Sequence, residues 1–93
     1  MRLSTEEVNA IKSITRDFDS EAKIILFGSR LDDTGRGGDI DLLVLSRKAS
    51  LKEKIKLLVA LKSKIGERKI DLILKQKHDS AFTEMVVNTG IKL

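Results

Sequence analysis

Three short apolar segments, each bordered by glycine or polar residues, most constrain what this chain can fold into. They cover residues 23–27, 39–45 and 68–74 and are rich in isoleucine, leucine and valine. Segments of this length and composition are typical of buried β-strands. Because a strand must bury its apolar face against another layer, we expect the rest of the chain to supply covering helices.

Much of the chain around these strands has apolar residues at the three- and four-residue spacing of a helix. Ser4 and Glu7 form a capping-box pattern that begins a predicted helix over residues 5–18. A second helix is predicted over residues 51–65, ending at Gly66. Its apolar side chains at helical spacing are Leu51, Ile55, Leu58, Leu61 and Ile65.

A last helix is expected to begin at Asp79 or Ser80 and to end at Gly90. Its expected core side chains are Phe82, Met85 and Val86. The order helix, strand, loop, strand, helix, strand, helix predicts the α/β (α+β) class, with a small mixed sheet of about three to four strands covered by helices. A length of 93 residues predicts a single domain over residues 1–93.

Composition excludes several classes of protein. The chain has no cysteine, which excludes disulfides and thiolate zinc sites. No apolar run approaches the roughly 20 residues that span a bilayer, and the first residues lack the apolar stretch of a signal peptide. We therefore expect a cytoplasmic protein with no membrane partner.

The formal net charge of +4 could attract polyanions. However, the aromatic residues are only Phe18, Phe27 and Phe82, and each occupies an apolar position of its segment. None is expected to be an exposed platform on which bases stack. Nucleic-acid binding is therefore the weakest hypothesis, and we do not expect such a partner.

Asp39 and Asp41 stand at the start of the second predicted strand. Positions i and i+2 of a strand point to the same face, with Cα atoms roughly 6.5 Å apart. The two carboxylates would repel each other unless a cation lay between them. Mg²⁺ prefers oxygen ligands and is usually held by one or two carboxylates plus substrate phosphates. The pair therefore predicts a divalent metal site.

Asp71 is the third candidate carboxylate and lies between Ile70 and Leu72 in the third predicted strand. Strand alternation places it on the face opposite these two neighbours. It can join Asp39 and Asp41 if the second and third strands lie side by side. Three acids can hold two metal ions, about 3.5–4 Å apart, that clamp the attacking and leaving oxygens of an in-line displacement.

Gly28, Ser29 and Arg30 follow the first strand and form a candidate phosphate site. Glycine lets a phosphate approach the backbone closely. A helical turn beginning at Ser29 would direct N–H groups at that phosphate. The Ser29 hydroxyl adds a donor, and the Arg30 guanidinium can pair with a phosphate oxygen.

Gly28-Ser29, a loop of about ten residues, Asp39-Ile40-Asp41 on a strand and Asp71 on a later strand resemble the signature of the polymerase-β-like nucleotidyltransferase superfamily. The resemblance runs from about residue 23 to residue 74. The small size is similar to that of its minimal members, the MNT proteins, which are usually encoded beside a HEPN-domain partner. The resemblance implies the palm-like nucleotidyltransferase fold.

The resemblance also implies roles for the residues. Those that contact the triphosphate of ATP would be Gly28, Ser29 and Arg30. The catalytic and metal-binding residues would be Asp39, Asp41 and Asp71, holding two Mg²⁺ ions, or Mn²⁺ in their place, with Asp71 helping to activate the acceptor hydroxyl. Where relatives often carry a basic residue, this loop has Asp32 and Asp33, and Arg36 is the candidate substitute.

By this resemblance, the leading hypothesis is a Mg²⁺-dependent protein adenylyltransferase. It would move AMP from ATP to a hydroxyl of a HEPN-domain toxin, within a hetero-oligomer, and so act as the antitoxin. A separate acceptor-binding domain would not fit in so short a chain, so the partner would bring the acceptor. The alternative is a non-catalytic antitoxin, a binding module that neutralises the HEPN partner by contact alone.

Overall fold

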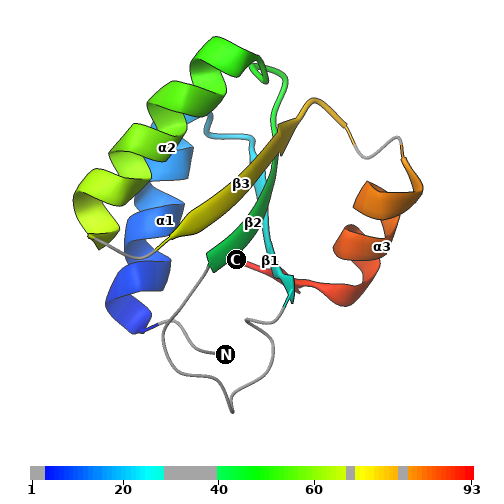
Figure 1. Ribbon diagram of the computed structural model, residues 1–93, viewed down its shortest axis with the longest axis horizontal. Helices are drawn as coiled ribbons and strands as arrows, with labels where there is room; N and C mark the ends of the chain where they lie inside the picture. Colours follow the sequence, from blue (N-terminus) through cyan, green and yellow to red (C-terminus); the bar gives the residue numbers. More distant parts are fainter. Residues whose placement is uncertain (1–3, 29–39, 67–68, 78–79) are drawn as a thin grey trace.

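The computed structural model of the chain describes residues 4–28, 40–66, 69–77 and 80–93. Over these residues the chain forms a four-stranded sheet and three helices (Figure 1). In chain order the elements are α1 (Thr5–Phe18), β1 (Lys23–Phe27), β2 (Ile40–Leu45), α2 (Leu51–Ile65), β3 (Ile70–Lys75), α3 (Ala81–Thr89) and β4 (Ile91–Lys92). The predicted α/β (α+β) class is confirmed.

The sheet is mixed, and its strand order is β3-β2-β1-β4. β1 pairs antiparallel with both β2 and β4, whereas β2 and β3 pair in parallel. Parallel strands need a crossover connection, which α2 provides. β4 was not predicted, because a strand of two residues is too short to show any alternation.

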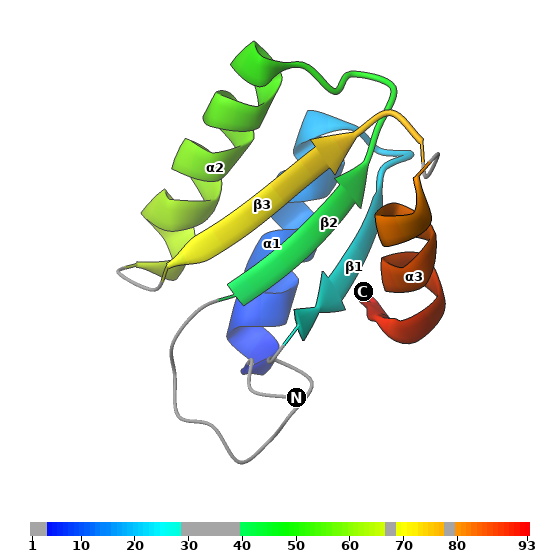
Figure 2. The same ribbon diagram turned by 45° about the vertical axis from the view of Figure 1, so that its right-hand side comes forward.

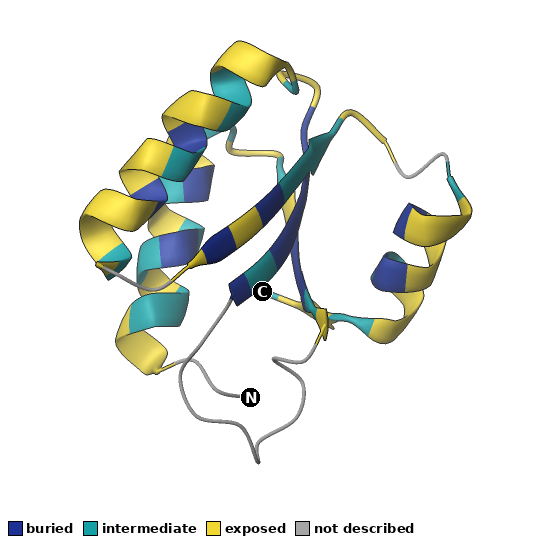
Figure 3. Ribbon diagram, viewed as in Figure 1, coloured by how far each residue is buried: buried dark blue, intermediate teal, exposed yellow. Residues whose placement is uncertain are grey.

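Helices cover both faces of the sheet. Figures 1 and 2 show α1 and α2 on one side and α3 on the other. The core under α1 and α2 includes Ile11, Leu26, Leu42 and Leu61, whereas a smaller core under α3 joins Ile25, Leu43, Leu45 and Val86. Successive side chains of a strand point to opposite faces, so β1, β2 and β3 each contribute to both cores. Buried residues accordingly line the strands and the inner sides of the helices in Figure 3.

Side-chain caps set the helix ends. The predicted capping box of α1 is present: the backbone N–H of Glu7 donates to Ser4 Oγ over 3.1 Å, and the N–H of Ser4 donates to Glu7 Oε1 over 2.9 Å. Of the two predicted caps for α3, Ser80 is the N-cap. α2 ends at Gly66, whose φ of +98° favours glycine.

The prediction of which side of α2 is buried is partly wrong. Leu57 and Leu61 are buried, whereas the exposed fractions of Leu51 and Ile55 are 74% and 54%. Val59, one turn further on, is 63% exposed. Residues four apart share one side of a helix, so these three form an apolar stripe on the surface. α2 carries apolar residues around much of its circumference, and periodicity alone could not tell which would meet α1 and the sheet.

The expected core of α3 is also partly wrong. Val86 is buried, but Phe82 and Met85 are 46% and 53% exposed. α3 meets the sheet through Thr83 and Val86, which are three residues apart on the helix. Among the helices in the described parts of the chain, none is long and apolar enough to cross a membrane.

Candidate functional site

Strand pairing brings two of the predicted carboxylates together. Asp41 in β2 lies opposite Asp71 in β3, and on its other side it lies opposite Phe27 in β1. Phe27, Asp41 and Asp71 therefore form one row across three neighbouring strands. Their side chains point to the face that α3 covers, because the alternate residues Leu26, Leu42 and Leu72 belong to the core under α1 and α2.

Asp41 and Asp71 are neighbours on adjacent strands, which lie about 4.7–4.9 Å apart. Like charges on opposed residues of neighbouring strands repel each other, and a cation between them removes the repulsion. Carboxylate oxygens are the ligands that Mg²⁺ and similar hard cations prefer. The two residues therefore fit a divalent metal ion in chemistry and in placement.

The row is open to solvent. Asp71 is exposed and lies on β3, an edge strand of the sheet, while Asp41 is half-buried. α3 packs one residue row further along, where Val86 meets Ile25 and Leu43. The carboxylates thus stand on a rigid sheet but at the border of the covered area, where a substrate can reach them.

The other predicted site residues lie outside the described residues. These are Asp39, Ser29 and Arg30, together with the loop residues Asp32, Asp33 and Arg36. Within residues 4–28, 40–66, 69–77 and 80–93, no group of three acidic, histidine or cysteine side chains is gathered around a possible metal position. The described part of the site is thus a pair of carboxylates, and a third from Asp39 stays a prediction.

Gly28 is placed against the carboxylate of Asp41. Its φ is +75°, in the left-handed region that side chains disfavour. A Cβ built on Gly28 would collide with Asp41 Oδ2. Glycine is therefore required here for two reasons, the backbone conformation and the space occupied by the carboxylate.

Phe82 is a candidate functional residue that was not predicted from the sequence. Its ring meets that of Phe27 edge-to-face, with centroids 5.9 Å apart and an interplanar angle of 82°. Phe82 is 46% exposed, so the expectation that its side chain lies in the core is wrong. The only signal in the sequence is the position of Phe82 in the first turn of a short helix, directly after the strand that carries Asp71.

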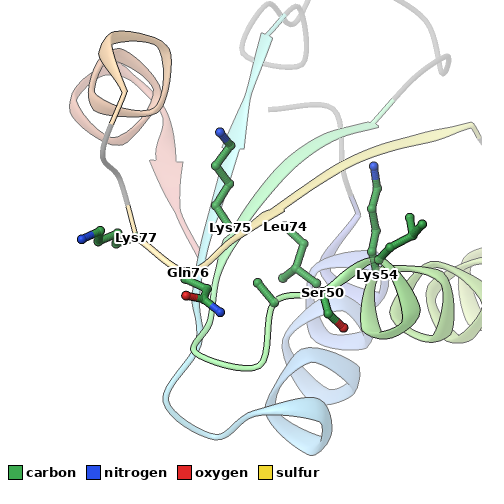
Figure 4. A pocket seen from close by; sticks show the side chains of 8 residues that line it. Ser50, Lys54, Leu74, Lys75, Gln76 and Lys77 are labelled. Atoms are coloured by element: carbon green, nitrogen blue, oxygen red, sulfur yellow. The ribbon is translucent and has the colours of Figure 1, made fainter.

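A hollow of about 490 Å³ lies elsewhere, between the start of α2 and the end of β3. It is lined by Ser50, Leu74 and Gln76, among others, at the end of β3 opposite Asp71. Figure 4 shows the amino groups of Lys54, Lys75 and Lys77 spread apart around it. They do not converge on one point, so the hollow offers no formed anion site.

Asp19 is an acid whose pKa is shifted, and it lies away from the carboxylate row. The hydroxyl of Ser46, directly after β2, donates to Asp19 Oδ2, and the backbone N–H of Glu21 donates to Oδ1 over 3.0 Å. These hydrogen bonds lower the pKa of Asp19 below its ordinary value of 3.8. Because Asp19 follows α1, the bonds tie the end of that helix to the end of β2, a structural role.

Comparison with known families gives one match. Residues 9–93 match the model of the family described as polymerase beta, nucleotidyltransferase. The matched region covers most of the chain and includes Gly28, Asp41 and Asp71. Among curated proteins, no sequence matches the chain.

Proposed function

Because this chain belongs to the polymerase-β nucleotidyltransferase family, we propose that it transfers AMP from ATP to a hydroxyl group of a partner protein. The family match indicates nucleotidyl transfer in general, and domains of this family generally use divalent metal ions. The proposal goes beyond the family match in three respects, which are the use of Mg²⁺, the choice of ATP and a protein acceptor. The observation that carries it is the register that sets Asp41 beside Asp71 on an open sheet border.

In the proposed site, Asp39, Asp41 and Asp71 are the metal ligands, with two Mg²⁺ ions bound, or Mn²⁺ in their place. These ions would neutralise the charge that develops on the phosphate oxygens. Gly28, Ser29 and Arg30 would hold the triphosphate. Asp41 and Asp71 are fixed by strand pairing, so they are held in place before the substrate arrives, which is the contribution that positioned charges make to such transfers.

The transfer step needs a hydroxyl close to the carboxylate row. The acceptor oxygen forms a bond to the α-phosphorus, the bond from that phosphorus to the bridging oxygen of the β-phosphate breaks, and pyrophosphate leaves. The proton of the hydroxyl would pass to the carboxylate of Asp71 as this bond forms. Asp71 is exposed on the edge strand, and so it is the described carboxylate that a protein-borne hydroxyl can reach most directly.

A partner protein is supported by the surface of α2. The stripe of Leu51, Ile55 and Val59 leaves apolar side chains in water, and such surfaces commonly mark interaction sites. α2 also carries five lysines and one glutamate: Lys52, Lys54, Lys56, Lys62, Lys64 and Glu53. An acidic, partly apolar surface would complement this helix. We propose that the partner is a HEPN-domain toxin and that this chain, a single minimal nucleotidyltransferase domain, is its cytoplasmic antitoxin.

The second candidate function is neutralisation of that partner by contact alone. It is favoured by the position of the α2 stripe, which lies on the opposite side of the sheet from the face of Asp41 and Asp71 (Figure 1). A partner held only at α2 would be bound away from the carboxylates. The two functions make different predictions for a purified complex.

The test combines the chain, ATP, Mg²⁺ and a HEPN-domain protein encoded beside it, followed by mass spectrometry of both proteins. We expect the partner to gain one or more AMP units and to gain none when Asp41→Asn, Asp71→Asn or Asp39→Asn replaces the wild type. Asp17→Asn, an exposed change on α1, is the matched control and should leave transfer intact. A stable complex without modification, unaffected by these changes, would support the binding module instead.

A further inference from the structure

The exposed ring of Phe82 lies one side chain away from the carboxylate row. Phe27 is the link, because it lies opposite Asp41 across β1 and β2 and also packs against Phe82. Opposed residues of antiparallel strands have Cα atoms about 4.5–5.5 Å apart, and the two ring centroids are 5.9 Å apart. Phe82 is thus a near neighbour of Asp41 on the same face of the sheet.

Phe82 stands apart from the other aromatic side chains. The chain has three phenylalanines and neither tyrosine nor tryptophan. Phe18 and Phe27 are half-buried and pack against the two cores, whereas Phe82 is 46% exposed. Phe82 is therefore the phenylalanine most open to solvent, and Phe27 alone separates it from Asp41.

The ring is also held in place. Ser80 and Thr83 form a capping box around the first turn of α3, with the Thr83 N–H donating to Ser80 Oγ over 3.2 Å and the Thr83 hydroxyl donating to the Ser80 carbonyl over 3.0 Å. Thr83 is fully buried, so the backbone next to Phe82 is anchored to the body of the protein. Phe27 supports the ring from the side through the edge-to-face contact. Because the ring is already held in place, it loses little conformational entropy when a planar ligand binds to it.

We propose that Phe82 is the platform on which the base of the bound nucleotide stacks, an inference that rests on the proposed nucleotidyl transfer. The ligand is a nucleoside triphosphate whose phosphates lie at Gly28 and the carboxylates and whose base reaches across Phe27 to Phe82. Every base has a π-face, so stacking on a single phenylalanine does not by itself select one base. Phe82 should therefore contribute to the binding of ATP and GTP alike.

The experiment measures binding of nucleotides with Mg²⁺ by calorimetry to the wild type and to Phe82→Leu, which keeps the apolar volume but removes the ring. Loss of one base-stacking contact is expected to weaken ATP and GTP binding by about 5- to 100-fold. Inorganic tripolyphosphate, which has phosphates but no base, should bind equally well to both proteins. Phe82→Trp should retain the affinity for ATP.

Phe18→Leu is the matched control, because it makes the same change on α1, on the other side of the sheet. It should leave ATP binding unchanged. Each other outcome is decisive. A wild type that binds no ATP overturns the proposed function along with this inference. Unchanged ATP affinity in Phe82→Leu overturns the inference alone. An equal loss of affinity for tripolyphosphate does so too, as does a loss of ATP affinity that is confined to the complex with the partner protein.

Discussion

Replacement of Gly28 by alanine separates the stability of the fold from the geometry of the site. The φ of +75° is unfavourable for alanine by about 1–2 kcal/mol. A domain of this length has a free energy of unfolding of roughly 5–14 kcal/mol, so Gly28→Ala should remain folded. The new methyl group, however, occupies the space of Asp41 Oδ2. The Asp41 carboxylate must then shift to make room for the methyl group, and so it leaves its position beside Asp71.

Gly66→Ala is the matched control for this change. Gly66 has a φ of +98° and a ψ of −142°, a region that is adopted almost only by glycine, so alanine there carries a backbone penalty of about 1–3 kcal/mol, yet no atom lies within 4 Å of the added Cβ. In urea unfolding followed by circular dichroism, Gly28→Ala should lose about 1–2 kcal/mol and Gly66→Ala about 1–3 kcal/mol. Only Gly28→Ala should lose affinity for ATP with Mg²⁺, by about 10- to 100-fold, the range seen when the surroundings of a metal ligand are disturbed. Equal ATP affinity in the two variants would refute the reasoning.

Three further predictions concern stability. Asp71→Asn removes a negative charge beside Asp41, so it should raise the free energy of unfolding in the absence of metal by about 0.2–1 kcal/mol, as measured in urea with a chelator present. Ser46→Ala removes the hydrogen bond that lowers the pKa of Asp19. A lowered carboxyl pKa stabilises the fold at pH values above the ordinary pKa of 3.8, and this stabilisation is lost as the pH falls through the folded-state pKa. The variant should therefore be less stable than wild type at pH 7, and the difference should shrink at pH 3. In Gly90→Ala a Cβ would collide with backbone carbonyl oxygens, so thermal unfolding should show a loss of about 1–3 kcal/mol.

Much of the secondary structure was predictable because local chemistry determines it. The bounds of α1, β1 and α2 agree with prediction, since Ser4 and Gly66 are strong end signals and a short, nearly all apolar segment bordered by Gly28 is typical of a buried strand. Alternation also gave the correct face for Asp71, opposite the buried Ile70 and Leu72. These features depend on residues close together in the sequence.

The features that local sequence could not determine depend on packing between distant segments. Alternation says which face Asp71 occupies, but only the pairing of β3 with β2 sets it beside Asp41. The two-residue β4 exists because the chain after α3 meets the free edge of β1. The exposure of Phe82 likewise follows from which side of α3 meets the sheet, because Thr83 and Val86 are buried there instead.

Asp41 and Asp71 are expected to share a divalent cation beside the nucleotide, and the proposed transfer depends on this. Electron paramagnetic resonance of Mn²⁺ titrated into the protein with a non-hydrolysable ATP analogue tests it directly. The wild type should convert free Mn²⁺ into a bound signal, and Asp41→Asn and Asp71→Asn should each weaken that binding, whereas Asp17→Asn should not. Undiminished Mn²⁺ binding in both site variants would contradict the claim.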